Sequence, residues 1–237
     1  NELKRYAHLG TGNYHRKNSL IYTDYSLLTA DETLCADVHK VFQQITGMGK
    51  KIHPNLLIHA PFNLKKSLLK MIAEEAAAAE AGKEARIVAK LNALTDPEMI
   101  RALYEASNAG VKVDLIVRGM CCLRPGIEGV SENIRVVSII GRFLEHSRVY
   151  YFKNSEQQLY CSSADWMERN LSNRIEVCFP ILKKKHQSRI LAEIEWHLED
   201  EIQCWELGAD GEYIKIQQAA AQEPTQGVQQ RLLEKLA

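Results

Sequence analysis

The chain has 237 residues, of which 46% are hydrophobic, and its 30 basic and 30 acidic side chains give a formal net charge of zero. This length is sufficient to bury a full core as one domain plus a smaller unit. The charge balance argues against a general nucleic-acid binder, which normally carries a strongly basic face. No apolar run reaches membrane-spanning length, and no secretory signal pattern opens the sequence.

The first part of the chain, residues 1–52, is predicted to form a unit of its own. Two short strands, 6–9 and 20–23, flank the glycine turn GTGN, and a helix follows over 31–46. Four apolar side chains recur at helical spacing and are expected to face inward: Leu34, Val38, Val41 and Phe42.

A run of glycines and lysines that ends at Pro54 predicts a linker after this unit. We expect the second unit to span 53–216. The remaining residues, 217–237, contain a proline and a glycine before a helix-forming stretch, which is typical of a tail with a short helix.

The second unit alternates strands with helices. Its predicted strands are rich in Val, Ile or Tyr and are bounded by turn residues, and they cover 56–60, 86–91, 112–118, 134–140, 147–153, 158–163 and 174–180. The first helix is capped by Asn63 and stops at Gly82, the second starts at Asp96–Pro97 and stops at Gly110, and the third covers 185–204. This order predicts an α/β fold with a mixed sheet flanked by helices.

Arginine is concentrated between Lys112 and Arg174. This stretch contains seven of the thirteen arginines but only two lysines. A guanidinium offers a planar fork of donors to anionic oxygens, so this choice of residue favours a phosphate-binding site over a merely solvated surface. The six cysteines lack CxxC spacing and mostly sit in apolar contexts, which is typical of buried reduced thiols: Cys35, Cys121, Cys122, Cys161, Cys178 and Cys204.

Several long, irregular motifs make the interpretation more specific. LIVRGMCCLRPGIEGVSENIRVVSIIGRFLEHSR and YCSSADWMERNLSNRIEV resemble the last domain of the bacterial polyphosphate kinases that work through a phosphohistidine. HLGTGNYHRKNSLIYTDYSLLTAD resembles the end of the domain before it. With KLNALTDPEMIRALYEASNAGVKVDL, the match covers residues 6 to about 205.

The resemblance implies a phospholipase D-like fold, in which two similar halves each contribute a histidine followed two residues later by a basic residue. His146 and Arg148 supply the second half's pair, with arginine in place of the usual lysine. The first half's histidine, which accepts the phosphate in the family, is expected upstream of Asn1, as are the metal ligands. We therefore expect a carboxy-terminal piece of a longer enzyme, with 1–52 as a remnant of the first half.

His8 and His15 are not expected to replace that phosphate acceptor. Neither histidine is followed two residues later by a basic residue on a strand, and the local sequence supplies no partner side chain for either of them.

His146 is the expected catalytic residue of this chain, because the resemblance places FLEHSR at the shared site. A neutral imidazole could take or give a proton there, and a protonated one could stabilise the leaving phosphate. The resemblance also assigns ATP contacts to His146, to Arg118 at the end of a strand, and to Tyr22 by stacking.

A second set of residues is expected to contact polyphosphate oxygens or to support the site. Lys90 and Asn92 end one strand on the side where Arg118 ends the next. Asp165 is expected either to orient His146 or to cap a turn, and Arg174 either to bind phosphate or to pair with Glu176 or Asp165. The full set is Asn13, Lys90, Asn92, Arg148, Asp165 and Arg174.

The sequence and the resemblance together predict a phosphotransferase acting on ATP, ADP and inorganic polyphosphate with Mg²⁺, which this isolated chain would not catalyse alone. The alternatives are a phospholipase D-like phosphodiesterase and a catalytically inactive piece that binds nucleotide or polyphosphate. No nucleic-acid partner is expected. The resemblance implies a homo-oligomeric, cytoplasmic enzyme, and leaves a peripheral association with the membrane open.

Overall fold

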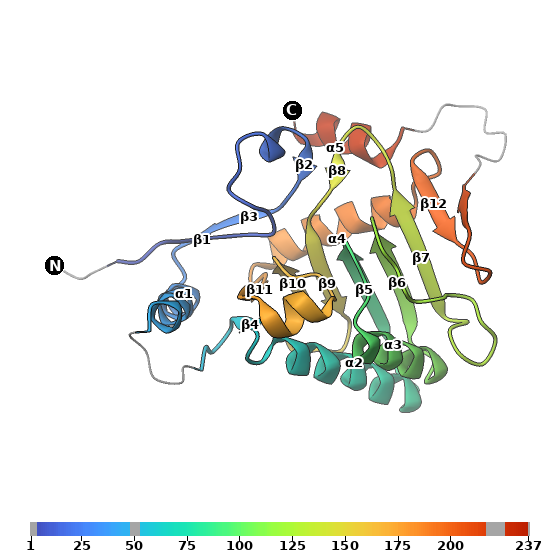
Figure 1. Cartoon of the computed structure of the whole chain (residues 1–237), viewed down its shortest axis with the longest axis horizontal. Helices are drawn as coiled ribbons and strands as arrows, with labels where there is room; N and C mark the ends of the chain where they lie inside the picture. The colour runs from blue at the N-terminus through green and yellow to red at the C-terminus, as the bar shows by residue number, and fades with distance from the viewer. Residues whose placement is uncertain (1–3, 48–52, 217–225, 237) are drawn as a thin grey trace.

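A mixed sheet of nine strands forms the centre of the protein (Figure 1). The computed structural model describes residues 4–47, 53–216 and 226–236. From one edge to the other the strands are β13 (Tyr213–Lys215), β12 (Cys204–Leu207), β7 (Ile134–Ile139), β6 (Lys112–Val117), β5 (Arg86–Leu91), β9 (Arg148–Phe152), β10 (Leu159–Ser162), β11 (Glu176–Pro180) and β4 (Ile58–Ala60). The β5–β6 and β6–β7 pairs are parallel and the other neighbours antiparallel, which confirms the predicted mixed sheet flanked by helices.

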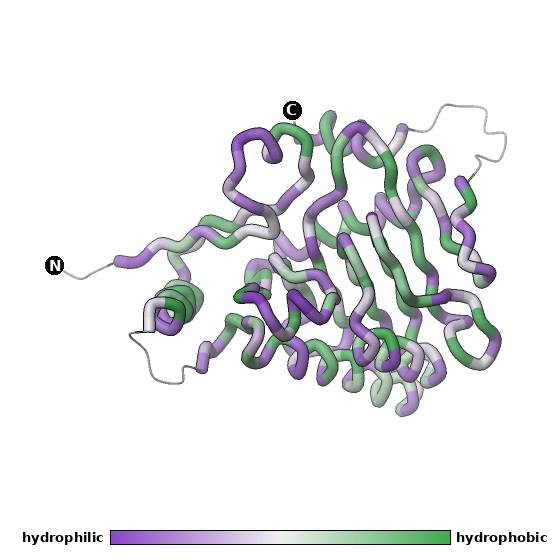
Figure 2. Tube along the Cα trace, in the orientation of Figure 1, coloured by the Kyte–Doolittle hydropathy of each residue, from purple (hydrophilic) through white to green (hydrophobic). Residues whose placement is uncertain are grey.

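Helices cover both faces of this sheet. On one face, α2 (Leu64–Glu80) and α3 (Pro97–Asn108) pack against the side of β5 that carries Ile87, Ala89 and Leu91. On the other face, α4 (Lys184–Leu198) packs against Val88. Side chains alternate along a strand, so Lys90 lies on the α4 face with Val88. Figure 2 shows that the central strands are largely hydrophobic, as burial on both faces requires.

The predicted ends of α2 and α3 are mostly confirmed. The Asp96 carboxylate accepts hydrogen bonds from the Glu98 and Met99 amides at 3.0 and 3.1 Å, with Pro97 in the first turn. Gly82 and Gly110 follow the two helices with positive φ angles of 74° and 94°. Asn63 is the exception, because its side chain accepts from the His59 amide at 2.9 Å and makes no hydrogen bond to the helix.

The N-terminal segment forms a small two-stranded sheet and a helix beside the large sheet. In it, β1 (Ala7–Gly10) pairs antiparallel with β3 (Ser26–Thr29), and α1 (Glu32–Ile45) follows. Leu34 and Val41 are buried as predicted, but Phe42 is 62% exposed, so its predicted inward position is wrong. Between β1 and β3, a turn of 3-10 helix, η1 (Asn18–Leu20), leads into β2 (Tyr22–Thr23).

The sequence prediction is also wrong at the end of α4. Cys204 lies in β12 and not in the helix, because the Asp200 carboxylate accepts from the amides of Ile202 and Gln203 and turns the chain. Four strands were not predicted: β3, β8 (Leu144–Glu145), β12 and β13. A short π-helix, η2 (Arg169–Asn173), precedes β11, and α5 (Val228–Leu236) provides the helix predicted for the tail.

Four of the six cysteines are buried free thiols, in agreement with the sequence: Cys35, Cys161, Cys178 and Cys204. Burial raises the pKa of Cys161 to about 12, so this thiol stays protonated near neutral pH. None of the helices in the described ranges combines the length and apolar character needed to cross a membrane. The predicted linker at 48–52 and the tail residues 217–225 lie outside the described residues.

Candidate active site

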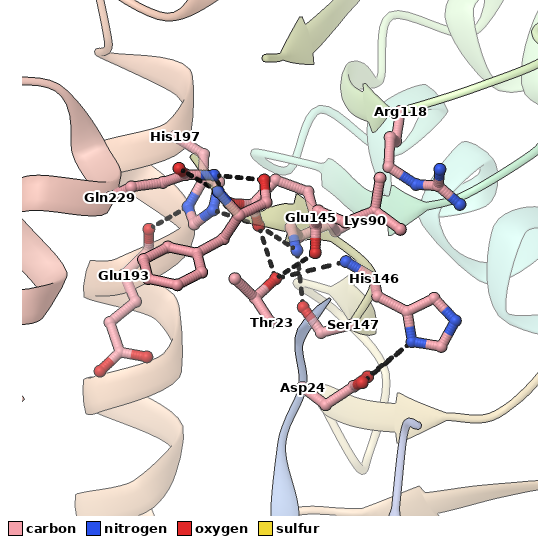
Figure 3. A network of polar contacts seen from close by, with 12 residues as sticks. Thr23, Asp24, Lys90, Arg118, Glu145, His146, Ser147, Glu193, His197 and Gln229 are labelled. Atoms are coloured by element: carbon pink, nitrogen blue, oxygen red, sulfur yellow. Dashed lines mark hydrogen bonds and ion pairs between the residues drawn. The ribbon is translucent and has the colours of Figure 1, made fainter. Parts of the chain in front are cut away.

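A two-stranded parallel ribbon brings distant parts of the chain together at His146. In this ribbon β2 pairs with β8 (Leu144–Glu145), so that Tyr22 lies opposite Leu144 and Thr23 opposite Glu145. His146 follows β8 and Asp24 follows β2. The two oxygens of the Asp24 carboxylate lie 2.9 and 3.1 Å from Nδ1 of His146 (Figure 3). His146 is 8% exposed.

This contact defines the hydrogen-bonding role of each imidazole nitrogen. An ionised carboxylate only accepts, so Nδ1 of His146 is the donor, and Nε2 is the nitrogen that can accept a hydrogen bond or exchange a proton, with Arg148 Nη1 3.2 Å away. Sequence reasoning missed Asp24. The aspartate lies 122 positions from His146, and no motif spacing connects the two residues.

The turn GTGN of the N-terminal segment holds Asp24 from the other side. Thr11 Oγ1 donates to Asp24 Oδ1 at 2.6 Å and accepts from the Tyr25 amide at 3.0 Å. A Cβ atom at Gly12 would lie 2.1 Å from Asp24 Oδ2, so only glycine leaves room for the carboxylate here. The turn thus acts as a cradle for the partner of His146.

Arg148 and Asp165 form a buried pair next to the imidazole. The guanidinium donates to the two Asp165 oxygens at 2.9 and 3.3 Å and to the Thr11 carbonyl at 2.9 Å. Its Nη1 atom lies 3.2 and 3.4 Å from the two ring nitrogens of His146. Such a bidentate pair fixes both side chains geometrically, so Arg148 supports the imidazole from inside the protein.

Asp165 does not take either of the two roles expected for it. Its carboxylate contacts Arg148 rather than His146, and it accepts from the backbone amides of Asn92 at 2.6 Å and Ala93 at 3.3 Å. It therefore ties Arg148 to the end of β5.

Asn92 connects Arg118 to His146. Its side-chain oxygen accepts from Arg118 Nε at 3.0 Å, and its side-chain nitrogen donates to the His146 carbonyl at 3.2 Å. Arg118 is half-buried, and within the described residues it forms no ion pair. Burial lowers the pKa of Arg118, although a guanidinium remains charged in proteins. Its Nη atoms are therefore available to an anionic ligand.

Tyr22 and Asn13 line an opening beside this cluster. The Tyr22 ring lies 4.7 Å from the His146 ring, centroid to centroid, at an interplanar angle of 46°. A cavity of about 480 Å³ is bounded by Tyr22, Asp24 and the 10–19 loop, including the exposed Asn13. Tyr22 thus contacts the imidazole and also lines the cavity.

Two predicted ligand residues lie elsewhere. Lys90 is 2% exposed, and its ammonium contacts Glu145 Oε2 at 2.8 Å and Ser147 Oγ at 2.6 Å. The alternation of β5 turns this side chain toward α4, which explains why it lies inside the protein and not beside Arg118. Arg174 is exposed after η2, and its proposed ion pairs with Glu176 and Asp165 are absent from the described part of the chain.

The described residues also contain no group of three or more His, Cys, Asp or Glu side chains that could hold a metal ion. The carboxylates near His146 are already engaged, Asp24 by Thr11 and His146, and Glu145 by Lys90. These residues do not fit a magnesium site, and no metal ligand is assigned to them.

Comparison with known proteins identifies the family. Residues 57–227 match the model of polyphosphate kinase C-terminal domain 2, and residues 1–51 match that of C-terminal domain 1. The chain belongs to the polyphosphate kinase family. The part of the chain that the two family models match begins before β1 and ends directly before α5.

Individual relatives agree with this assignment. The chain is 61% identical over 237 residues to a polyphosphate kinase from Pseudomonas aeruginosa, covering 100% of this chain and 34% of the relative. It is 53% identical over 217 residues to one from Xylella fastidiosa, covering 91% and 31%. The crystal structure of polyphosphate kinase from Porphyromonas gingivalis superposes with a TM-score of 0.92 at 34% identity, covering 98% of this chain and 35% of that one. The chain thus spans about a third of the length of these relatives.

Proposed function

We propose that this chain forms the part of a polyphosphate kinase that binds the nucleotide phosphates and assists phosphoryl transfer between ATP and polyphosphate. The observation that carries the proposal is the Asn92 bridge, which joins an arginine without an ion-pair partner among the described residues to the main chain of His146. Arginine with free donors binds phosphate oxygens in fixed geometry. Family membership supplies the reaction class.

In the proposed reaction, a histidine nitrogen in another part of the enzyme attacks the γ-phosphorus of ATP and the bond to the bridging oxygen breaks, releasing ADP. A terminal polyphosphate oxygen then attacks the phosphohistidine and the P–N bond breaks. Charge develops on the transferring group and on the leaving oxygen. Arg118 would neutralise charge on the phosphates, and the His146 imidazole would donate or accept a proton at Nε2, held in place by Asp24.

Tyr22 would stack on the nucleotide base or ribose at the mouth of the cavity, and Asn13 would lie at the same opening. The buried positions of Lys90 and Arg148 favour supporting roles for both residues. The enzyme would require Mg²⁺ bound outside these residues. We retain the division into 1–52, 53–216 and 217–237, together with a homo-oligomeric, cytoplasmic enzyme.

The phosphodiesterase alternative receives no support from the geometry. It would use a basic residue at position 148 as a phosphate ligand, whereas Arg148 already donates to Asp165 and to the Thr11 carbonyl. The non-catalytic binding alternative would apply to this chain in isolation, because we propose that the acceptor histidine lies in another part of the enzyme.

Two experiments test the proposal. In the complete polypeptide, His146→Ala should lower turnover by about 100-fold or more, as expected for loss of a general acid or base. Incubated with γ-labelled ATP, the 237-residue chain alone should remain unlabelled in alkaline electrophoresis. Wild-type turnover in the variant, or alkali-stable label on His8, His15 or His146, would overturn the assignment of roles.

A further inference from the structure

The β2–β8 ribbon carries a buried carboxylate, which contacts α4 and α5. Glu145, the residue before His146, is 3% exposed, and its Oε2 atom contacts Lys90 Nζ at 2.8 Å, Thr23 Oγ1 at 2.9 Å and His197 Nε2 at 3.2 Å (Figure 3). Burial alone would raise the pKa of Glu145, but Lys90 and His197 outweigh it and lower the pKa well below its usual range. Glu145 is therefore a fixed negative charge.

The C-terminal helix completes this network through one side chain. Gln229 of α5 is 4% exposed and donates from Nε2 to Glu145 Oε1 at 2.7 Å. The same amide accepts from the Phe143 N–H at 2.9 Å and donates to the Phe143 carbonyl at 2.9 Å. An exchange of both hydrogen bonds with one residue is the pattern of a neighbouring β-strand. Gln229 thus substitutes for a strand at the edge of the ribbon opposite β2.

The surrounding residues make room for this amide. A Cβ atom at Gly141 would lie 2.5 Å from Gln229 Oε1 and 2.1 Å from Gln203 Nε2. The Gln203 side-chain oxygen in turn accepts from the backbone N–H of Gln229 at 3.3 Å. On the outer side of α5, the Arg231 guanidinium lies 3.8 Å above the Trp196 ring of α4. The start of α5 is therefore anchored at several points around Gln229.

Further along α5, a cavity lies between the helix and the ribbon. Leu232, Leu233 and Leu236 line a cavity of about 290 Å³ that also borders Tyr22 and Thr23. Within the described residues, every hydrogen bond from α5 to the 143–145 segment comes from Gln229. The hydrogen-bonded link between α5 and this segment therefore runs through one side chain.

We propose that Gln229 is a positioning residue for His146, so that the C-terminal helix controls the alignment of the phosphoryl-transfer site. This inference rests on the proposed function. The connection runs through Glu145, whose carboxylate binds Thr23, while Thr23 Oγ1 also accepts from the His146 amide at 3.3 Å. Thr23 and Glu145 directly precede Asp24 and His146, so the network sets the ends of both strands that carry the Asp24–His146 contact.

The first test compares Gln229→Met with Gln230→Met in the complete polypeptide. Methionine keeps the length of glutamine but removes its hydrogen bonds. Gln230 lies next to Gln229, is exposed, and bonds to Glu234. We expect Gln229→Met to lower kcat about tenfold with a change in nucleotide KM below about threefold, because small misplacements of reacting groups cost rate more than binding. Gln230→Met should match the wild type. An unchanged kcat in Gln229→Met, or an equal loss in both variants, would overturn the proposal.

The second test does not depend on kinase activity. The imidazole ¹⁵N signals of His146 are recorded in the 237-residue chain. They are assigned as the signals that disappear in the His146→Ala variant. Gln229→Met should shift or broaden these signals, whereas Gln230→Met should leave them unchanged. Unchanged signals in Gln229→Met would contradict the positioning role even if the complete enzyme were inactive for other reasons. Inactive wild-type enzyme with responsive signals would instead count against the proposed function alone.

Gly141→Ala provides an independent variant if Gln229→Met fails to fold. Its added Cβ displaces the side-chain amides of Gln229 and Gln203, while residue 229 keeps its chemistry. We expect the same loss of kcat and the same change at His146. A fully active Gly141→Ala enzyme with unchanged His146 signals would contradict the proposal.

Discussion

The carboxylate of Asp24 lies 2.9 Å from Nδ1 of His146, although 122 positions separate the two residues along the chain. One residue comes from the segment that matches C-terminal domain 1 and the other from the segment that matches domain 2. The site is therefore assembled from both segments. Its geometry depends on the short β2–β8 pairing that brings them side by side (Figure 1).

Asp24→Asn should lower kcat in the complete polypeptide by about 100-fold, because the amide keeps the shape of the carboxylate but no longer selects the imidazole tautomer. Asp31→Asn is the matched control. Asp31 caps α1 by accepting from the Leu34 amide at 2.9 Å, and asparagine caps a helix equally well. Steady-state kinetics of both variants decides the matter, and an active Asp24→Asn enzyme would exclude an orienting role for Asp24.

Gly12→Ala should reduce activity strongly, because its Cβ would lie 2.1 Å from Asp24 Oδ2 and would push the carboxylate away from His146. Gly10→Ala is the matched control in the same turn, because its Cβ would meet no atom closer than the Tyr25 carbonyl oxygen at 3.6 Å. We expect the Gly10 variant to retain activity. Equal kinetics for the two variants would show that the cradle around Asp24 is not required.

Arg118→Lys should weaken ADP binding by about tenfold, because a point charge does not reproduce the bidentate fork of a guanidinium. Arg124→Lys serves as the control, since the Arg124 guanidinium is exposed and bonds to the Ala209 carbonyl away from the cluster. Titration calorimetry on the 237-residue chain measures both affinities. Wild-type ADP affinity in Arg118→Lys would remove this residue from the nucleotide site.

Polyphosphate binding should weaken more steeply with salt than ADP binding. A long chain neutralised by several basic side chains releases more condensed counterions than one nucleotide does. The formal net charge of the chain is zero, so any steep dependence must come from a local cluster. Affinities of both ligands for the 237-residue chain are compared between low and physiological salt. Equal slopes, or no polyphosphate binding at low salt, would mean that the arginines between Arg118 and Arg174 are structural.

Asp37→Asn should destabilise the fold at neutral pH by about 1–3 kcal/mol. Burial raises the pKa of Asp37, but the amides of Asn55, Leu56 and Leu57 and the Lys40 ammonium together lower it below its ordinary value. A depressed carboxyl pKa adds stability that is fully present above the unfolded value of about 3.9 and is lost as the pH falls through the folded value.

Urea unfolding at several pH values tests this linkage. The difference between wild type and Asp37→Asn should be constant above about pH 5 and should shrink as the solution is acidified further. Asp210→Asn is the control, because the exposed Asp210 carboxylate bonds to the Glu212 amide within a local turn. A difference that does not depend on pH would mean that the Asp37 charge contributes nothing to stability.

Period and turn chemistry were sufficient to predict most elements of the second unit. The β5 strand was predicted over its observed range, and the Asp96–Pro97 start of α3 is confirmed. Both signals are local, because a strand's alternation and a helix cap depend on neighbouring residues. The strands that were missed, β3, β8, β12 and β13, are two to four residues long, and β8 and β12 gain hydrogen bonds from strands that are distant along the chain, β2 and β7. Local sequence carries little information about such pairing.

The family resemblance placed His146, Arg118 and Tyr22 in one site, and the structure brings these three residues together. Sequence alone determined the family, the mixed α/β sheet and the residue types suited to phosphate. Only the tertiary structure decided which charged side chains pair with one another inside the protein: Lys90 with Glu145, Arg148 with Asp165, and Asp24 with His146. The physical reason is that an ion pair needs its partners within a few ångströms, and the folded chain brings together residues that lie 17 to 122 positions apart.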